Sequence, residues 1–285
     1  MDNKSLDNVK DFWENNPLFI GEAKNEKGTK KFFEEHTQVY ISDCFAGEFD
    51  QKTVPNNLKD KTVLDLGCGI GFWVVQLSKS NPNKIIAADL TNSALNLTKK
   101  RCNILGLNNV EFINANAEEL PFKDSTFDHI NCQGVIHHTP NTDRAIKEIS
   151  RVLKPGGTFS ISVYYRNFIL RSWPFISPLG KILSKFGGGL KGRGREKIFS
   201  TKDINEIVRL YDGGDNPIGK SYSRKSFQAL FDNQKNLIID DTFLHFFPAR
   251  SLPFYIPGTV HKYLDKRLGF MIYKNGRKKM DDFNN

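Results

Sequence analysis

Short apolar runs alternate with helix-like segments between residues 62 and 165, and this alternation limits the fold more than any other feature of the sequence. Runs of apolar and β-branched residues predict strands at 62–66, 84–88, 110–114, 127–132 and 158–164. The segments between them predict helices at 72–80, 93–105 and 143–153. Because crossovers between parallel strands are right-handed, a strict β-α alternation winds helices onto both faces of an open parallel sheet. A ligand is expected at the carboxyl ends of these strands.

The flanking regions predict additions to this core. Helices are expected before it at 6–14 and 29–45, where they either pack on the sheet edge or cover the ligand. After it comes a segment rich in Gly, Pro, Lys and Arg, which predicts a lid or substrate insertion. A helix at 223–231 and strands at 237–247 and 269–273 would then bring the sheet to seven strands. The expected organisation is an N-terminal helical cover (1–58), a core (59–165), an insertion (166–222) and a C-terminal part that completes the sheet (223–285).

Composition excludes some classes and leaves others open. The four cysteines form no CxxC pair, which predicts reduced thiols and no zinc site. The polar start and the lack of any run of about 18 apolar residues predict a cytoplasmic protein without a signal peptide or membrane span. The net charge of +9 arises from the part after residue 150. This excess suits an anionic substrate, a membrane surface, nucleic acid or simply a solvated basic face.

A glycine turn follows the first predicted strand. Residues 63–71 read Val-Leu-Asp-Leu-Gly-Cys-Gly-Ile-Gly and lead into a helix. Glycine is needed where a ligand presses on the backbone or where φ is positive, and a helix start presents free N–H groups. Dinucleotide and phosphate sites use similar turns. The spacing here is GxGxG rather than GxGxxG, and no GxxxxGK[ST] motif is present.

The turn resembles the first motif of class I S-adenosylmethionine (SAM)-dependent methyltransferases, in particular the type 11 small-molecule group. Further matching motifs follow in the family's order: Asp89 after the second strand, residues 116–122 after the third, 134–138 after the fourth and 148–157 before the fifth. The resemblance covers residues 59–165. It implies an α/β, Rossmann-like, doubly wound and mostly parallel sheet, with SAM as cofactor and S-adenosylhomocysteine as product.

The motifs indicate the cofactor-binding residues. Asp89 can accept hydrogen bonds from both ribose hydroxyls, and Asp65 can meet the cationic end of SAM directly or through water. The resemblance implies that adenine lies near Leu90 and residues 116–118, with Asn116 where the family commonly has Asp. Gln133 and Gly134 are expected to face the methionine end. The full predicted set is Asp65, Gly67, Cys68, Gly69, Gly71, Asp89, Leu90, Asn116, Ala117, Glu118, Gln133 and Gly134, with no metal ligand.

Three residues are candidates for catalysis. Histidine as a residue type titrates near neutrality, so His137 or His138 could remove a proton, although this pair is frequent in the type 11 group and one member could simply shape the loop. Tyr211 begins the segment 211–217, which could instead be an exposed turn. Because the sulfonium is already activated, the protein mainly aligns the reactants and excludes water. Further candidate bases are His36, Tyr40, Tyr164, Tyr165, Asp215 and His245.

The sequence therefore predicts an enzyme that transfers a methyl group from SAM to a small or lipid-like acceptor by in-line displacement. Residues 168–186 mix apolar and basic side chains, which indicates a hydrophobic lid or a peripheral membrane contact. An RNA methyltransferase is one alternative, suggested by the basic second half. However, the Asn/Asp-Pro-Pro-aromatic motif of many nucleic-acid methyltransferases is missing, so nucleic acid is not the expected partner. A non-catalytic SAM-binding regulator is the other alternative. The acceptor and the oligomeric state do not follow from the residues.

Overall fold

The computed structural model describes residues 5–17, 19, 23–183, 185 and 195–280. Its strands are β1 (Thr62–Leu66), β2 (Lys84–Asp89), β3 (Val110–Asn114), β4 (Phe127–Gln133), β5 (Leu153–Tyr165), β6 (Ser221–Tyr222), β7 (Leu237–His245) and β8 (Met271–Lys278). Within the described residues they form one eight-stranded sheet, whose main path runs β3-β2-β1-β4-β5-β8-β7 while β6 pairs with β5. The first five strands of this path are parallel, and β8 and β7 are antiparallel additions. The predicted mostly parallel α/β sheet is confirmed, and the short strand β6 makes it one strand larger than the seven predicted.

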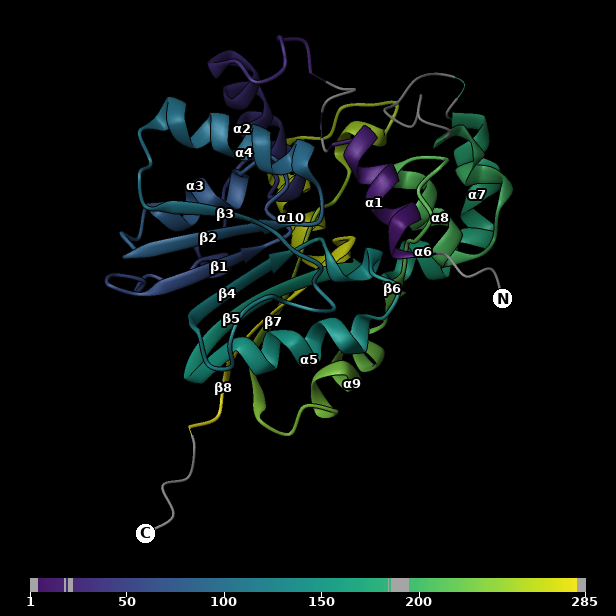
Figure 1. Cartoon of the computed structure of the whole chain (residues 1–285). Helices are drawn as coiled ribbons and strands as arrows, with labels where there is room; N and C mark the ends of the chain where they lie inside the picture. The colour runs from purple at the N-terminus through teal and green to yellow at the C-terminus, as the bar shows by residue number, and fades with distance from the viewer. Residues whose placement is uncertain (1–4, 18, 20–22, 184, 186–194, 281–285) are drawn as a thin grey trace.

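Helices cover both faces of this sheet (Figure 1). They are α1 (Leu6–Asn15), α2 (Lys30–Cys44), α3 (Phe72–Ser78), α4 (Asn92–Leu105), α5 (Thr142–Val152), α6 (Phe168–Arg171), α7 (Trp173–Leu183), α8 (Ile204–Asp212), α9 (Arg224–Asp232) and α10 (Gly258–Leu268). Figure 1 shows α3 and α4 on one face and α5 and α9 on the other. Adjacent residues of β1 pack against the helices on opposite faces of the sheet, because side chains alternate along a strand. Val63 packs in the core with α3, and Leu64 packs in the core with α5 and α9.

Polar residues at helix starts explain several element boundaries. The Thr29 hydroxyl accepts the N–H of Phe32, and Asn141 accepts the N–H of Arg144 at the start of α5. Ser223 begins α9 with a capping box. Such side chains satisfy N–H groups that have no partner within the helix. The predicted helix starts therefore lie within one or two residues of the observed ones.

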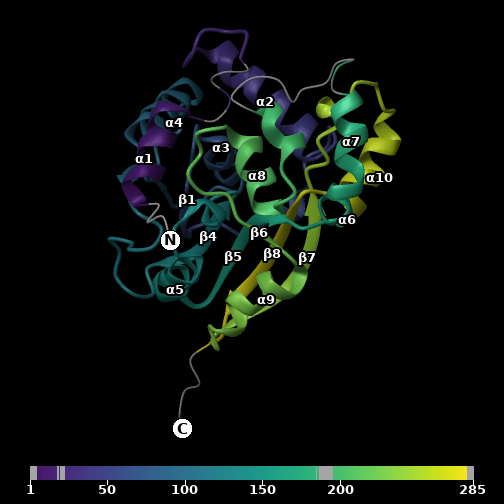
Figure 2. The same ribbon diagram turned by 90° about the vertical axis from the view of Figure 1, so that its right-hand side faces the viewer.

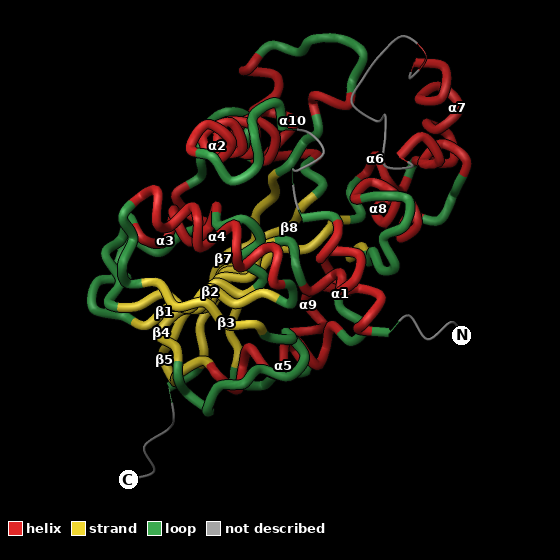
Figure 3. Tube along the Cα trace, turned by 45° about the horizontal axis from the view of Figure 1, so that its top comes forward, coloured by secondary structure: helices red, strands yellow, loops and turns green. Residues whose placement is uncertain are grey.

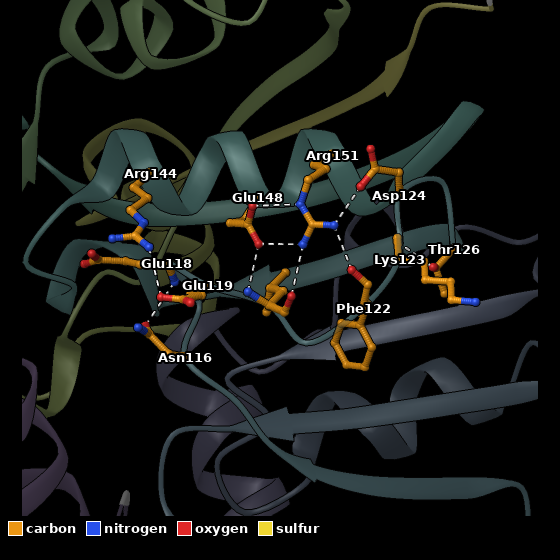
Figure 4. A network of polar contacts seen from close by, with 11 residues as sticks. Asn116, Glu118, Glu119, Phe122, Lys123, Asp124, Thr126, Arg144, Glu148 and Arg151 are labelled. Carbon is orange, nitrogen blue, oxygen red and sulfur yellow. Dashed lines mark hydrogen bonds and ion pairs between the residues drawn. The ribbon is translucent and has the colours of Figure 1, made fainter.

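The predicted strict alternation is wrong between β3 and β4, where residues 115–126 form a loop instead of a helix. Arg151 of α5 holds this loop (Figure 4). Its guanidinium donates to the carbonyls of Leu120 at 3.0 Å and Phe122 at 2.7 Å, and to Asp124 at 2.8 Å. It also makes a two-pronged pair with Glu148, which accepts the N–H of Leu120 at 2.8 Å. Side-chain bonds thus satisfy the backbone groups that a helix would have paired internally.

Strand β5 also begins earlier than predicted. Residues 154–157, which lie between the helix predicted at 143–153 and the strand predicted at 158–164, belong to the strand. Phe127 pairs with Leu153, but His129 pairs with Thr158, so the register shifts between them. A bulge of this kind accommodates extra residues in one strand of a pair.

The helices after β5 form a cap beside the sheet (Figure 2). We use "cap" for α6, α7, α8 and the 3₁₀ helix η4 (Arg195–Ser200). The cap has its own apolar cluster, in which Leu170 and Trp173 meet Ile207 and Val208. With the top of the molecule turned forward, the cap helices α6, α7 and α8 lie to the right of the strands (Figure 3). Part of the predicted lid, residues 184 and 186–194, lies outside the described residues. No described helix is long and apolar enough to cross a membrane.

Candidate active site

The glycine turn ends β1 and opens onto a cavity at the carboxyl edge of the sheet. Gly67 has φ +75°, and an added Cβ would lie 2.2 Å from Val135 Cγ2, so only glycine fits. Gly69 has φ +55°, and an added Cβ would meet nothing within 4 Å. The backbone at Gly69 therefore faces open space that a side chain would fill.

This cavity, the glycine-turn pocket, has a volume of about 170 Å³. Its wall comes from the ends of the four neighbouring parallel strands β3, β2, β1 and β4, from the start of α4 and from α1. Residues from the strand ends and α4 are Leu66, Gly67, Gly69, Asp89, Leu90, Thr91, Ala94, Ala115, Asn116, Ala117, Gln133, Gly134, Val135, His138 and Thr139. The N-terminal segment contributes Leu6, Val9, Trp13 and Pro17.

Asp89 joins the end of β2 to the glycine turn. Its carboxylate accepts the N–H of Gly69 at 3.0 Å, and the N–H and hydroxyl of Thr91 at 3.0 and 2.8 Å. Burial raises the pKa of Asp89, while the three donors act in the opposite direction. The carboxylate is thus fixed in the wall of the pocket.

A chain of buried polar side chains crosses the sheet behind the pocket. Asn131 donates to Asp65 at 2.7 Å, and Gln133 donates to Asn131 at 2.9 Å. Gln133 also donates to Ser160 at 2.8 Å, while its buried Oε1 has no hydrogen-bond partner among the described residues. Burial raises the pKa of Asp65 to about 7. The chain fixes the amide of Gln133 and leaves its oxygen available.

α1 closes the pocket from the N-terminal side. Glu14 accepts the N–H groups of Asn92 at 2.8 Å and Ser93 at 2.9 Å. A carboxylate at the start of α4 also interacts favourably with the helix dipole. The neighbouring Trp13 lies with its ring 5.0 Å from the ring of His138.

A second cavity, the histidine chamber, adjoins the first and has a volume of about 560 Å³. His138 Nδ1 lies 2.7 Å from the carbonyl oxygen of Ile218, and its Nε2 lies 3.5 Å from Asp212 Oδ2. Tyr164 donates its hydroxyl to Asp212 Oδ1 at 2.8 Å. Four residues line both cavities: Trp13, Gln133, Gly134 and His138.

The similarity to known proteins matches this geometry. A family described as "Methyltransferase domain" matches residues 57–177. The ubiquinone/menaquinone biosynthesis C-methyltransferase UbiE of Vibrio campbellii is 33% identical over 156 residues, which are 52% of this chain and 58% of the relative. The UbiE protein of Escherichia coli is 35% identical over 126 residues, 43% of this chain and 47% of the relative. The chain thus spans about half the length of the curated relatives it matches.

Residues 57–177 form a class I SAM-dependent methyltransferase domain. Solved structures share its fold. A SAM-dependent methyltransferase from Methanosarcina mazei superimposes with a TM-score of 0.55 at 21% identity, covering 79% of this chain and 96% of that one. One from Mesorhizobium loti gives a TM-score of 0.53 at 14% identity, covering 80% and 95%.

The residues of the methyltransferase domain fit SAM. The open space at Gly69 lies where a side chain would obstruct a ligand, and the Asp89 carboxylate lines the same pocket. The unpartnered Gln133 oxygen can accept a hydrogen bond where the two cavities meet. Within the part of the chain that the structure describes, no cluster of three His, Cys, Asp or Glu side chains could hold a metal ion.

The predicted cofactor residues of the methyltransferase domain fall into two groups. Those that line the glycine-turn pocket are Gly67, Gly69, Asp89, Leu90, Asn116, Ala117, Gln133 and Gly134. Those that do not line it are Asp65, Cys68, Gly71 and Glu118. Asp65 is buried behind the wall and acts on Gln133 through Asn131. Glu118 accepts the N–H of Asn141 at 2.6 Å and so ties the loop after β3 to the start of α5.

The three predicted catalytic residues, His137, His138 and Tyr211, all line the histidine chamber. Of the other candidate bases, His36, Tyr40 and Tyr164 also line it, whereas Tyr165, Asp215 and His245 do not. His245 is buried between Asp265, with 2.5 Å between Nδ1 and Oδ2, and Asp50, with 3.1 Å between Nε2 and Oδ2.

The prediction missed two residues of the chamber, Asp212 and Trp13. Asp212 follows Tyr211 in the segment singled out in the sequence, but nothing local indicates that it reaches His138. Trp13 belongs to a predicted helix, and its place over His138 depends on how α1 docks. Only the tertiary fold brings these residues together.

Proposed function

We propose that this chain transfers the methyl group of SAM to a small or lipid-like acceptor held in the histidine chamber, leaving S-adenosylhomocysteine. The observation that carries the proposal is the shared wall of the two cavities, formed by Trp13, Gln133, Gly134 and His138. A ligand in the glycine-turn pocket can thereby present one end to the chamber. The name of the UbiE relatives, C-methyltransferases of ubiquinone and menaquinone biosynthesis, supports a small acceptor.

The chain's own residues divide the work of binding. When bound, SAM supplies a methyl group already activated by its sulfonium centre. Asp89 and Asn116 offer acceptors on the nucleoside side, and Gln133 offers its amide oxygen at the junction with the chamber. Trp13 covers this junction and excludes water, which strengthens polar interactions inside.

We propose His137 as the general base when the acceptor must lose a proton. Burial is the main cause that lowers the pKa of His137 well below its usual value, and His138 and Lys220 add to the effect. The imidazole is therefore neutral at physiological pH, and its Nδ1 has no partner among the described residues. His137 lies with its ring 4.5 Å from that of Tyr164. His138 and Tyr164, joined through Asp212, hold the chamber wall in place.

Two measurements test this function. Calorimetry should show S-adenosylhomocysteine binding in the micromolar range, about −8 kcal/mol. Incubation with SAM and fractionated metabolite and lipid extracts should then yield S-adenosylhomocysteine and an acceptor heavier by one methyl group. His137→Ala should slow turnover by about 100-fold or more while leaving S-adenosylhomocysteine affinity unchanged.

Three other results would contradict the proposal. Absence of S-adenosylhomocysteine binding would exclude a SAM-dependent enzyme. Binding without turnover on any fraction would favour a non-catalytic regulator. Methylation of tRNA or rRNA, with affinity that falls steeply as salt rises, would favour the nucleic-acid alternative.

We further propose that the chain is cytoplasmic and contacts an anionic membrane surface through the cap. Within the cap, Phe175 is 87% exposed and Phe168 is 64% exposed, and Tyr255, outside the cap, is 87% exposed. Residues 166–185 contain four basic residues and no acidic one. Exposed apolar side chains among basic ones suit an interface with anionic lipid.

Sedimentation with vesicles tests this contact. Vesicles of phosphatidylglycerol should retain the protein more strongly than vesicles of phosphatidylcholine. Phe175→Asp should weaken retention, whereas Leu105→Asp, at an exposed position on α4, should not. Equal retention by both lipids, or no effect of Phe175→Asp, would exclude the proposed contact.

A further inference from the structure

A third cavity lies between the cap and residues 246–253, and it shares no lining residue with the glycine-turn pocket. Its volume is about 320 Å³, within the range of small-molecule sites of roughly 300–1,000 Å³. The wall is almost entirely apolar. From the cap it includes Leu170, Ile176, Leu179, Leu183, Ile207 and Val208. We call it the apolar cavity.

The apolar cavity continues from the histidine chamber. Both are lined by Tyr164, Tyr211, Phe246, Pro248 and Ser251. Tyr211 and Phe246 lie edge to face at 5.7 Å where the cavities meet. The histidine chamber therefore adjoins the apolar cavity on one side and the glycine-turn pocket on another.

The apolar cavity also reaches the surface of the cap. Leu179 lines it and is 58% exposed. On the other side, Pro253 lines it and is followed by Phe254 and Tyr255, which are 55% and 87% exposed. Apolar residues thus continue from the wall of the cavity to the protein surface on both sides.

The apolar cavity favours an apolar ligand. Protein interiors are close-packed, and an empty apolar cavity loses the contacts that its wall would otherwise make. Water fills a cavity well only where several polar groups can bond it, and this wall offers few. A hydrocarbon chain has the shape and chemistry that this wall complements.

We infer that the acceptor carries an apolar chain, which lies in the apolar cavity while the acceptor's reactive head lies in the histidine chamber. This inference rests on the proposed function for the role of the head. The chain site itself stands on the cavity alone. The exposed apolar residues beside Leu179 and Pro253 mark the side from which the chain enters.

Binding of a fluorescent fatty acid tests the apolar cavity without any turnover. Dansylaminoundecanoic acid should bind the purified protein with increased emission, and linear primary alcohols should displace it. Affinity should rise about fourfold for each added methylene, which corresponds to about 0.8 kcal/mol, until the cavity is filled. Affinity that does not depend on chain length would overturn the inference.

A matched pair of variants locates the binding. Leu179→Asp places a charge in the wall at an exposed position, where the fold tolerates it, and should weaken alcohol binding at least about tenfold. Ile182→Asp changes an equally exposed residue of the same helix that does not line the cavity, and should have no effect. Equal effects of the two variants would place the chain on the outer surface and contradict the inference.

A second pair fills the cavity instead of charging it. Ile176→Trp should abolish alcohol binding, and Ile182→Trp should preserve it. S-adenosylhomocysteine affinity should be unchanged in all four variants, which also shows that each one folds. If the wild-type protein did not bind S-adenosylhomocysteine, the proposed function would be wrong, but the site inferred for a hydrocarbon chain would stand. Normal cofactor binding without chain binding would defeat only the chain site.

Discussion

The glycine-turn pocket and the apolar cavity are built in opposite ways. The pocket gathers backbone turns and fixed polar side chains from the ends of adjacent parallel strands, such as Gly69, Asp89 and Gln133. The cavity gathers apolar side chains from helices and loops between Tyr164 and Phe270. Hydrogen bonds fix the orientation of a ligand, whereas apolar walls select by size and shape. In the proposed function the sheet holds the cofactor and the cap holds the acceptor, so changes in one cavity should leave binding in the other intact.

The largest expected effect concerns Asp65, behind the pocket. Its carboxyl has a pKa of about 7 in the folded chain, against an ordinary value of 3.8. Between these values the folded chain holds a proton that the unfolded chain has lost, so the free energy of unfolding falls as pH rises from about 4 to about 7. The full difference corresponds to about 4 kcal/mol. In urea unfolding, Asp65→Asn should remove this part of the pH dependence.

Asp65→Asn also tests whether the glycine-turn pocket and the apolar cavity are independent. Alcohol binding in the apolar cavity should be the same for Asp65→Asn and the wild type at every pH where both are folded. A stability profile as steep in Asp65→Asn as in the wild type would show that Asp65 ionises at its ordinary pKa.

The second effect concerns the floor of the pocket. Gly69→Val puts a side chain into the open space that the cofactor needs, and should weaken S-adenosylhomocysteine binding by about 100-fold or more, close to 3 kcal/mol. Gly106→Val is the matched control, because Gly106 also has a positive φ and open space but lies at the end of α4. Similar losses in the two variants would attribute the effect to backbone strain alone.

The third effect concerns Asp89. Asp89→Ala removes the acceptor of three hydrogen bonds in the pocket wall and should weaken S-adenosylhomocysteine binding about tenfold, or about 1.4 kcal/mol, by calorimetry. Asp89→Asn should lose less. Alcohol binding that fell in parallel would break the comparison by showing that the two cavities are coupled.

The smallest effect concerns the cover over the pocket. Glu14→Gln removes the negative charge that accepts the N–H groups of Asn92 and Ser93. Losing a helix cap costs about 1 kcal/mol, so α1 should release the cofactor up to about fivefold faster in stopped-flow dissociation. Asp11→Asn, an exposed acidic position on the same helix, should leave the rate unchanged. An identical rate in Glu14→Gln would mean that α1 does not control release.

The two cavities also differ in how far the sequence predicts them. The strands that form the pocket are apolar runs bounded by turns, and β1 and β3 begin and end at the predicted residues. Glycine spacing and the acidic residue after β2 are local signals, since each follows a strand directly. The position of the pocket at the strand ends then follows from the rules of parallel sheets.

The remaining features depend on tertiary contacts. The loop at residues 115–126 is held by Arg151, about thirty residues later. The sequence of the loop itself therefore did not predict that a loop would replace a helix there. The chamber brings Trp13, His138 and Asp212 together from three distant segments. Apolar residues of the cap predicted a hydrophobic lid, but only the packing shows that they enclose a space.

The pairing of His245 with Asp50 and Asp265 joins three distant parts of the chain: the segment before β1, the end of β7 and α10. A chain shortened to begin at residue 59 would keep the sheet's parallel strands but remove one carboxylate from this buried imidazole. It would also remove α1, α2 and the aromatic side chain of Phe45, which lies 4.9 Å from His245. The domain at residues 57–177 also contacts both ends of the polypeptide, because β5 pairs with β8 and α4 packs against α1 and α2, so transplanting it alone would expose these surfaces.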